Sequence, residues 1–147
     1  MYRARLIGPL LNWIDMHVEV PAVTARELLR TSRGGANSSN ADDDSVTIRH
    51  RVEAARAIQQ RRFEDRPCVR TNADMSLAEL DAFCRLDLES TALLQKVVES
   101  LSRGARAAHR SLRVARTIAD LAGSRVIQLE HVAEAVQYQA SDRATIA

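Results

Sequence analysis

Aromatic residues are scarce in this sequence of 147 residues and make up only 3% of it. Alanine, leucine and valine supply most of the apolar mass, which favours helices over a β-sandwich or β-barrel, because strands are usually richer in aromatic and β-branched residues. Hydrophobic residues make up 46% and charged residues 27%, as in an ordinary soluble globular chain. The length allows one domain with a core, or a small domain with an appendage.

Cysteines and long apolar runs are also few. Cys68 and Cys84 are the only cysteines, and no metal-ligating side chain stands near them at the spacing of a zinc site. We therefore expect two reduced thiols and no bound metal. The apolar run Leu6–Leu11 is interrupted by Gly8-Pro9 and is far shorter than the ~20 residues that span a bilayer. No signal-peptide cleavage pattern follows it, so we expect a cytoplasmic protein.

Neither sign of charge is in clear excess. The net charge of +2 is too small to indicate a nucleic-acid partner by itself. Nearly all the basic residues are arginine, a bias that a GC-rich genome explains as easily as selection for phosphate binding does. Total charge therefore does not distinguish between classes of partner.

The first part of the chain does not follow a helical pattern. Apolar and polar residues alternate from Ile14 to Val20 and stop at Pro21, which predicts a half-buried strand. Because no second strand pattern is found, residues 1–30 are interpreted as a stub of a larger body that is poorly ordered alone. Residues 31–45 are rich in Gly, Ser, Asn and Asp and predict a flexible linker.

Residues 46–140 predict a mainly α structure, an antiparallel bundle of about five helices with short connections. Residues 141–147 are interpreted as a disordered tail. The first helix runs from about Val46 to Phe63 and places Ile48, Val52, Ala55 and Ile58 on one face. Its other face carries Arg49, Arg51, Arg56, Arg61 and Arg62, which we interpret as solvated.

The next two helices have clear start signals. Ser76 and Glu79 fit a capping box, and Met75 and Leu80 stand where a hydrophobic staple forms. Asp87 is the predicted N-cap of the helix that follows.

The stretch Ala105–Ala122 is the longest uninterrupted helical pattern. Small and branched apolar residues form one face, and Arg106, Arg110 and Arg113 recur on another at intervals of four and three. Planar guanidinium groups arranged in this way suit an anion such as phosphate. Gly123 is expected to end the helix in a left-handed conformation. Within this helix, Arg116 is predicted to pair with Asp120 one turn further along. The last helix of the chain is expected from about Leu129 to Tyr138.

Three blocks of the sequence together resemble a known family. They are Tyr2–Pro21, Arg51–Phe63, and Ser102–Gly123 followed by Ile127–Gln139. They are similar to the C-terminal part of the magnesium-chelatase-like AAA+ ATPases, the ComM/YifB group associated with bacterial competence. The run HRSLRVARTIADLAG is the most specific part, and the resemblance covers nearly the whole chain apart from residues 31–47.

The resemblance implies a role for each part of the chain. In this family the first block closes the ATPase core, and the helices after it form a lid that folds over the nucleotide. Matching the motif residue by residue places the sensor-2 arginine, which reaches the γ-phosphate in the same subunit, at Arg106. Arg103, Arg110 and Arg113 are weaker candidates for phosphate or DNA contacts.

The resemblance also implies cofactors and partners. Full-length members use ATP with Mg²⁺, assemble as rings and remodel DNA in the manner of a branch-migration helicase. The partners implied are the missing core, neighbouring subunits and possible DNA, with no membrane. The isolated chain is expected to be monomeric and to bind no cofactor tightly.

Two departures from the family pattern concern catalysis. The chain has no G-x-x-x-x-G-K-[ST] motif and no acidic strand end of the Walker B type, so it cannot hydrolyse ATP alone and no catalytic residue is assigned. Trp13 stands where the family has an arginine finger, and an indole cannot neutralise transition-state charge. Losing such an arginine removes a factor of ~10³–10⁵ in related phosphoryl-transfer enzymes, so a slow or degenerate parent ATPase is expected.

Other interpretations stay open at this stage. The helices could form a stand-alone module whose arginine face binds nucleic acid or an acidic partner, with affinity that falls steeply with salt. Because the sequence starts within what would be the end of the core, a cut fragment, a truncated reading frame and a pseudogene product are the remaining alternatives. His109 and His131 are interpreted as structural residues, since no nucleophile or orienting carboxylate accompanies them.

Overall fold

The computed structural model describes residues 14–16, 18, 20, 22, 44–101 and 104–140. Within these residues the chain forms five α-helices and one short 3₁₀ helix, and no strand, which confirms the mainly α prediction. The elements are α3 (Ser45–Arg62), η2 (Asn72–Asp74), α4 (Leu77–Phe83), α5 (Leu88–Leu101), α6 (Gly104–Leu121) and α7 (Leu129–Ala140).

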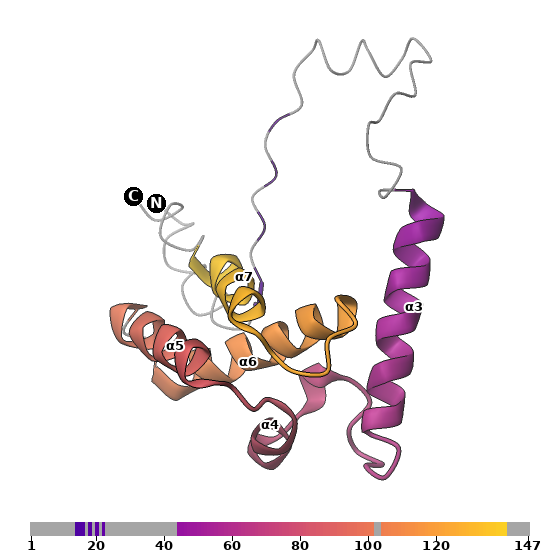
Figure 1. The fold of residues 1–147 in the computed structure, drawn as a ribbon, viewed down its shortest axis with the longest axis horizontal. Coiled ribbons are helices and arrows are strands. Elements are labelled where there is room, and N and C mark those ends of the chain that lie inside the picture. The colour runs from indigo at the N-terminus through magenta and orange to yellow at the C-terminus, as the bar shows by residue number, and fades with distance from the viewer. Residues whose placement is uncertain are drawn as a thin grey trace, which may run out of the picture.

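Helix α6 lies at the centre of the fold. It packs against α3, α4, α5, α7 and η2 (Figure 1). Helices α5 and α7 also pack against each other, so that α5, α6 and α7 form one bundle. Helix α3 contacts α6 near the C-terminal end of α6, and the N-terminal half of α3 extends away from the bundle (Figure 1).

The core is filled by small and medium side chains rather than by aromatic ones. Ala115 and Ala119 of α6 and Ala135 of α7 are at most 1% exposed, and such small side chains let two helices approach closely. Met75 and Val132, also 1% exposed, fill the remaining space. Cys84 is buried in the same cluster, where burial raises the pKa of its thiol to about 11.

The predicted helix ends are confirmed. Ser76 and Glu79 form the capping box of α4, in which the Ser76 amide donates to Glu79 Oε2 at 2.8 Å. The Ser90 amide donates to Asp87 Oδ1 at 2.8 Å, which caps α5. Gly123 has a φ of 68° and ends α6. The Ser124 amide donates to the Ala119 carbonyl at 2.8 Å, as in a Schellman motif.

The predicted apolar face of the first helix is buried only in its second half. Ala55 is buried and Ile58 is half-buried, but Ile48 and Val52 are each 45% exposed. The helical spacing of the apolar residues identified the correct face of the helix. It could not show that the bundle covers only the C-terminal half of α3, where the helix lies beside α6.

The predicted N-terminal strand, linker and tail fall mainly outside the described residues. Of the predicted strand, the structure describes residues 14–16, 18 and 20, and none of these lies in a strand. Only Asp44 and Ser45 of the predicted linker are described, and Ser45 begins α3. The predicted tail, residues 141–147, is not described.

Candidate functional site

The arginine face of α6 is the candidate site, and the structure gives its arginines different surroundings. Arg106 lies in the first turn of α6 and is exposed. Its side chain forms no hydrogen bond or ion pair with any other residue that the structure describes. A helix N-terminus carries unpaired amide donors and partial positive charge, so the surroundings of Arg106 favour an anion.

Arg110, one turn further along, is already engaged. Its Nη1 donates to the Ile14 carbonyl at 3.0 Å, and its Nε lies 3.7 Å from Asp15 Oδ1. The Arg110 side chain is only 12% exposed as a result. This residue connects α6 to the segment that precedes the predicted linker.

Arg113 is also engaged. Its Nε and Nη2 donate to the Met75 carbonyl at 3.2 and 2.6 Å. Because Met75 directly precedes the capping box of α4, Arg113 fixes the start of α4 against α6. Its guanidinium thus already has a carbonyl acceptor within the fold.

Arg116 belongs to a buried ionic network around Asp120. The predicted pairing is confirmed, with Arg116 Nε donating to Asp120 Oδ1 at 3.1 Å. Arg116 also donates to the Ser124 and Arg125 carbonyls at 2.6 and 3.0 Å, which ties it to the loop after α6. Burial lowers the pKa of Arg116, and the charge of Asp120 opposes that shift.

The prediction that Arg62 is solvated is wrong. Its guanidinium binds both oxygens of Asp120, and its Nη1 lies 2.7 Å from Asp120 Oδ2. Asn72 Nδ2 donates to the same oxygen at 2.8 Å. Arg62 is the last residue of α3, so this side chain connects the end of α3 to the end of α6.

The sequence contained no pattern that identifies this network as a whole. Only the Arg116–Asp120 pair has a helical spacing, and Arg62 lies 58 residues from Asp120. The one available indication was the helical spacing itself, which places Asp120 on the arginine face of α6, one turn after Arg116. A carboxylate that becomes buried there must find partners.

The remaining predicted site residues are placed as follows. Arg103 and Trp13 lie outside the described residues. His109 is half-buried, and His131 is buried with its Nδ1 accepting the Gln128 amide at 3.0 Å, which caps α7. The structural interpretation of His131 is therefore confirmed.

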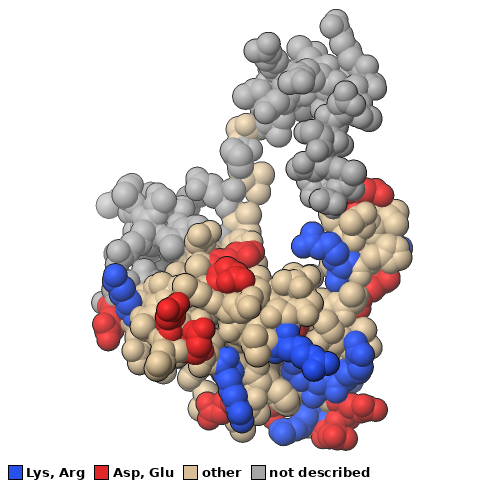
Figure 2. All heavy atoms as spheres, in the orientation of Figure 1, with Lys and Arg blue, Asp and Glu red and all other residues tan. Residues whose placement is uncertain are grey.

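Exposed charges of both signs are mixed near the C-terminal end of α3. Figure 2 shows blue and red spheres side by side over this part of the molecule. Arg66 in this region pairs with the buried Glu79, with Nη1 and Oε1 3.0 Å apart. Mixed charge provides less attraction for a polyanion than a face of one sign does.

Within the described part of the chain, no group of three His, Cys, Asp or Glu side chains could hold a metal ion. None of the helices described there is long and apolar enough to cross a membrane.

The comparisons with known proteins agree with one another. The family model described as magnesium chelatase, subunit ChlI C-terminal, matches residues 42–139. The chain is 36% identical over 145 residues to the uncharacterized protein YifB of Escherichia coli, covering 99% of this chain and 26% of that protein. It is 34% identical over 142 residues to competence protein ComM of Haemophilus influenzae, covering 97% of this chain and 26% of that one. The chain therefore spans about a quarter of the length of these relatives.

Proposed function

Because the chain belongs to the family of the C-terminal domain of magnesium chelatase subunit ChlI, we propose that it is the lid of a magnesium-chelatase-like AAA+ ATPase. In this proposal residues 1–30 close the ATPase core and residues 46–140 form the lid. Arg106 contacts the terminal phosphate of ATP bound by the same subunit. The observation that carries the proposal is that Arg106 is exposed, whereas Arg110, Arg113 and Arg116 already have partners within the fold.

The chemistry of Arg106 suits this role. A guanidinium group can donate two parallel hydrogen bonds to phosphate oxygens and remains charged at physiological pH. Its place in the first turn of α6 adds the partial positive charge of the helix N-terminus. The phosphate-cradling loop and the Mg²⁺ ligands would come from the core, since this sequence has no P-loop.

We further propose that the whole protein forms a ring and uses ATP to remodel DNA, with the lid coupling nucleotide state to subunit orientation. The resemblance of the sequence to the ComM/YifB group, and its similarity to competence protein ComM, are the basis of this proposal. Trp13, at the position of the family's arginine finger, implies slow hydrolysis. The proposal for Arg106 concerns nucleotide binding and does not depend on the rate of hydrolysis.

The alternative is a stand-alone module that binds nucleic acid through the arginine face of α6. The geometry favours it less, because Arg110 and Arg113 already donate to backbone carbonyls. Releasing them for phosphate contacts would leave these carbonyls without their present donors.

The test measures nucleotide binding with and without a core. In the isolated chain, a non-hydrolysable ATP analogue should not shift the amide resonances of the first turns of α6, around Arg106, below millimolar concentration. The chain is then joined to the part of the Escherichia coli relative that it does not match. In this fusion, Arg106→Gln should lower affinity for the ATP analogue about tenfold, as expected for a lost hydrogen bond to a charged group.

Affinity for ADP provides the internal control, because ADP lacks the phosphate that Arg106 would contact. It should be the same in the Arg106→Gln and unchanged fusions. Arg51→Gln, at an exposed arginine of α3, is the matched control for loss of charge. If Arg106→Gln leaves the preference for ATP over ADP unchanged, the sensor role is refuted.

A further inference from the structure

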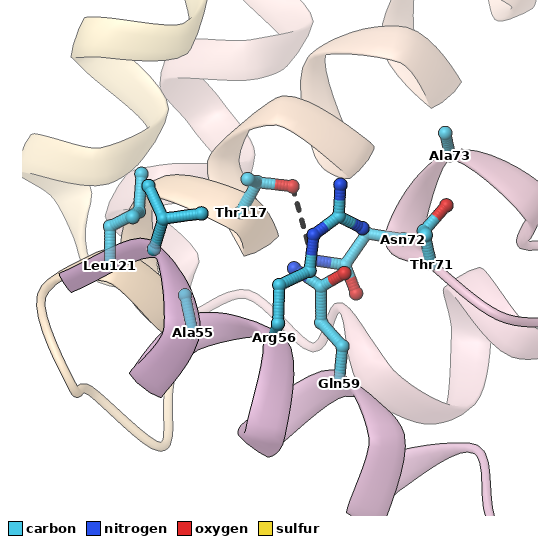
Figure 3. Close-up of a pocket in the computed structure, with 9 residues that line it drawn as sticks. Ala55, Arg56, Gln59, Thr71, Asn72, Ala73, Thr117 and Leu121 are labelled. Carbon is cyan, nitrogen blue, oxygen red and sulfur yellow. Dashed lines mark hydrogen bonds between the residues drawn. The ribbon is translucent and has the colours of Figure 1, made fainter. Parts of the chain in front are cut away.

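A second candidate site lies at the opposite end of α6, where α3, η2 and α6 enclose a pocket of about 290 Å³. The pocket has two unlike sides (Figure 3). Ala55 and Leu121 lie on one side, whereas Arg56, Gln59 and Asn72 lie on the other. Val52 and Leu121, which are 45% and 38% exposed, also line it, so apolar surface is accessible there.

Gln59 is the residue that indicates a ligand. It is 4% exposed and lines the pocket, and its Oε1 has no hydrogen-bond partner within the described part of the chain. A buried polar atom without a partner is costly. Rotation of the side chain about its last torsions would turn the edge of the amide, with its acceptor and its donor side by side, toward a molecule in the pocket.

The other polar groups define what kind of molecule would fit. Asn72 already donates to Thr117 Oγ1 at 3.1 Å and to Asp120 at 2.8 Å, and Asp120 is itself neutralised by arginines. The floor of the pocket therefore presents no free charge. Arg56 lines the pocket and is exposed to solvent, so a positive charge lies beside a neutral interior.

We propose that this pocket binds an adenine nucleotide, with the base in the pocket and the phosphate on Arg56. The carboxamide of Gln59 has the pattern that pairs with an adenine edge, accepting from N6 and donating to N7. Val52 and Leu121 pack against the face of the base. An adenine base with a phosphate beside it can belong to a free nucleotide or to an unpaired residue of a single-stranded nucleic acid.

This site is separate from the proposed sensor. Arg106 and Leu121 are 15 residues apart on one helix, which corresponds to about 22 Å. One mononucleotide cannot occupy both places. Failure of one proposal therefore leaves the other untouched.

The test is an NMR titration of the full chain with AMP, UMP and adenosine. AMP should shift the amide resonances of Val52, Gln59 and Leu121 and should bind more tightly than UMP. Gln59→Leu, which removes the amide while keeping a similar volume, should weaken AMP binding about tenfold and abolish the preference over UMP. Arg56→Gln should weaken binding of AMP but not of adenosine.

Three further variants make the result specific. Arg51→Gln and Arg106→Gln remove charges elsewhere and should leave AMP binding unchanged. Val52→Glu, at an exposed position that tolerates a polar side chain, should block the pocket and repel phosphate without unfolding the chain. Retained binding in Val52→Glu would overturn the proposal, as would the lack of any shift at pocket residues with millimolar AMP.

Comparison with oligonucleotides identifies the source of the nucleotide. If oligo(dA) binds much more tightly than AMP and oligo(dT) does not, the site accepts an unpaired adenine of a strand. Equal affinity of AMP and oligo(dA) per adenine would indicate a free nucleotide. Equal binding of oligo(dA) and oligo(dT) would overturn the adenine assignment.

Discussion

Asp120 is a buried carboxylate on which three side chains from different parts of the chain converge. Its side chain is fully buried, and it accepts hydrogen bonds from Arg62, Asn72 and Arg116. Replacing it with alanine would leave two buried cations without their counter-ion. We predict that Asp120→Ala lowers the free energy of unfolding by about 3–5 kcal/mol, as for other buried pairs that lose one partner. Urea denaturation followed by circular dichroism measures this.

The neighbour of Arg62 provides the control for that experiment. Arg61 is exposed, and its side chain donates to the Ala57 carbonyl of its own helix, at 3.3 Å, and to no other residue in the described part of the chain. Arg61→Ala should change stability by no more than about 0.5 kcal/mol. If Asp120→Ala is as mild as Arg61→Ala, the buried network does not stabilise the fold.

At the scale of elements, three successive helices begin with a capping carboxylate. These are Asp74 in η2, Glu79 in α4 and Asp87 before α5. Hydrogen bonds from Ser76 hold the pKa of Glu79 below its ordinary value of 4.5. The corresponding bonds from Thr71 and Ser90 lower the pKa of Asp74 and of Asp87.

These shifts predict a loss of stability in acid. Because the pKa of Glu79 is lower in the folded than in the unfolded state, its contribution is complete above about pH 4.5 and disappears as the pH falls through the lowered value. Glu79→Gln keeps a residue that can cap but does not titrate. It should flatten the dependence of the urea midpoint on pH below 4.5, whereas exposed Glu64→Gln should not. An unchanged acid limb in Glu79→Gln would contradict the assignment.

The elements also indicate what local sequence can and cannot predict. The caps at Ser76 and Asp87 and the stop at Gly123 were predictable because each depends on residues at most five positions apart. The burial of Arg62 was not, because its partner is distant in sequence and is brought near only when α3 packs on α6. The pocket beside Gln59 likewise depends on where α6 ends relative to α3.

At the scale of the whole molecule, α6 connects parts of the chain that are far apart in sequence. Its first turn carries Arg106, and its last turns bind the end of α3 through Asp120. Between them, Arg110 contacts Ile14 and Asp15. Arg110 and Ile14 are 96 residues apart in the sequence. If Arg106 senses nucleotide as proposed, Arg110 lies one turn away and is placed to transmit movement of α6 to the segment that follows Trp13.

The contact between Arg110 and the N-terminal segment can be tested in the chain itself. Arg110→Ala removes both the hydrogen bond to the Ile14 carbonyl and the nearby charge of opposite sign to Asp15. We predict that the resonances of residues 14–16 shift toward random-coil frequencies. Because Asp15 is 51% exposed, global stability should change by less than about 1 kcal/mol.

A charge exchange separates a specific contact from a general effect of the mutation. Asp15→Arg alone should release the segment. Asp15→Arg combined with Arg110→Asp should restore part of the original chemical shifts of residues 14–16, since the pair is re-formed with its signs reversed. The hydrogen bond to the Ile14 carbonyl would not be restored, because an ionised aspartate cannot donate. Partial rescue is therefore the expected result. Random-coil shifts for residues 14–16 in the unmodified chain would mean that Arg110 does not hold this segment and is free to contact phosphate alongside Arg106.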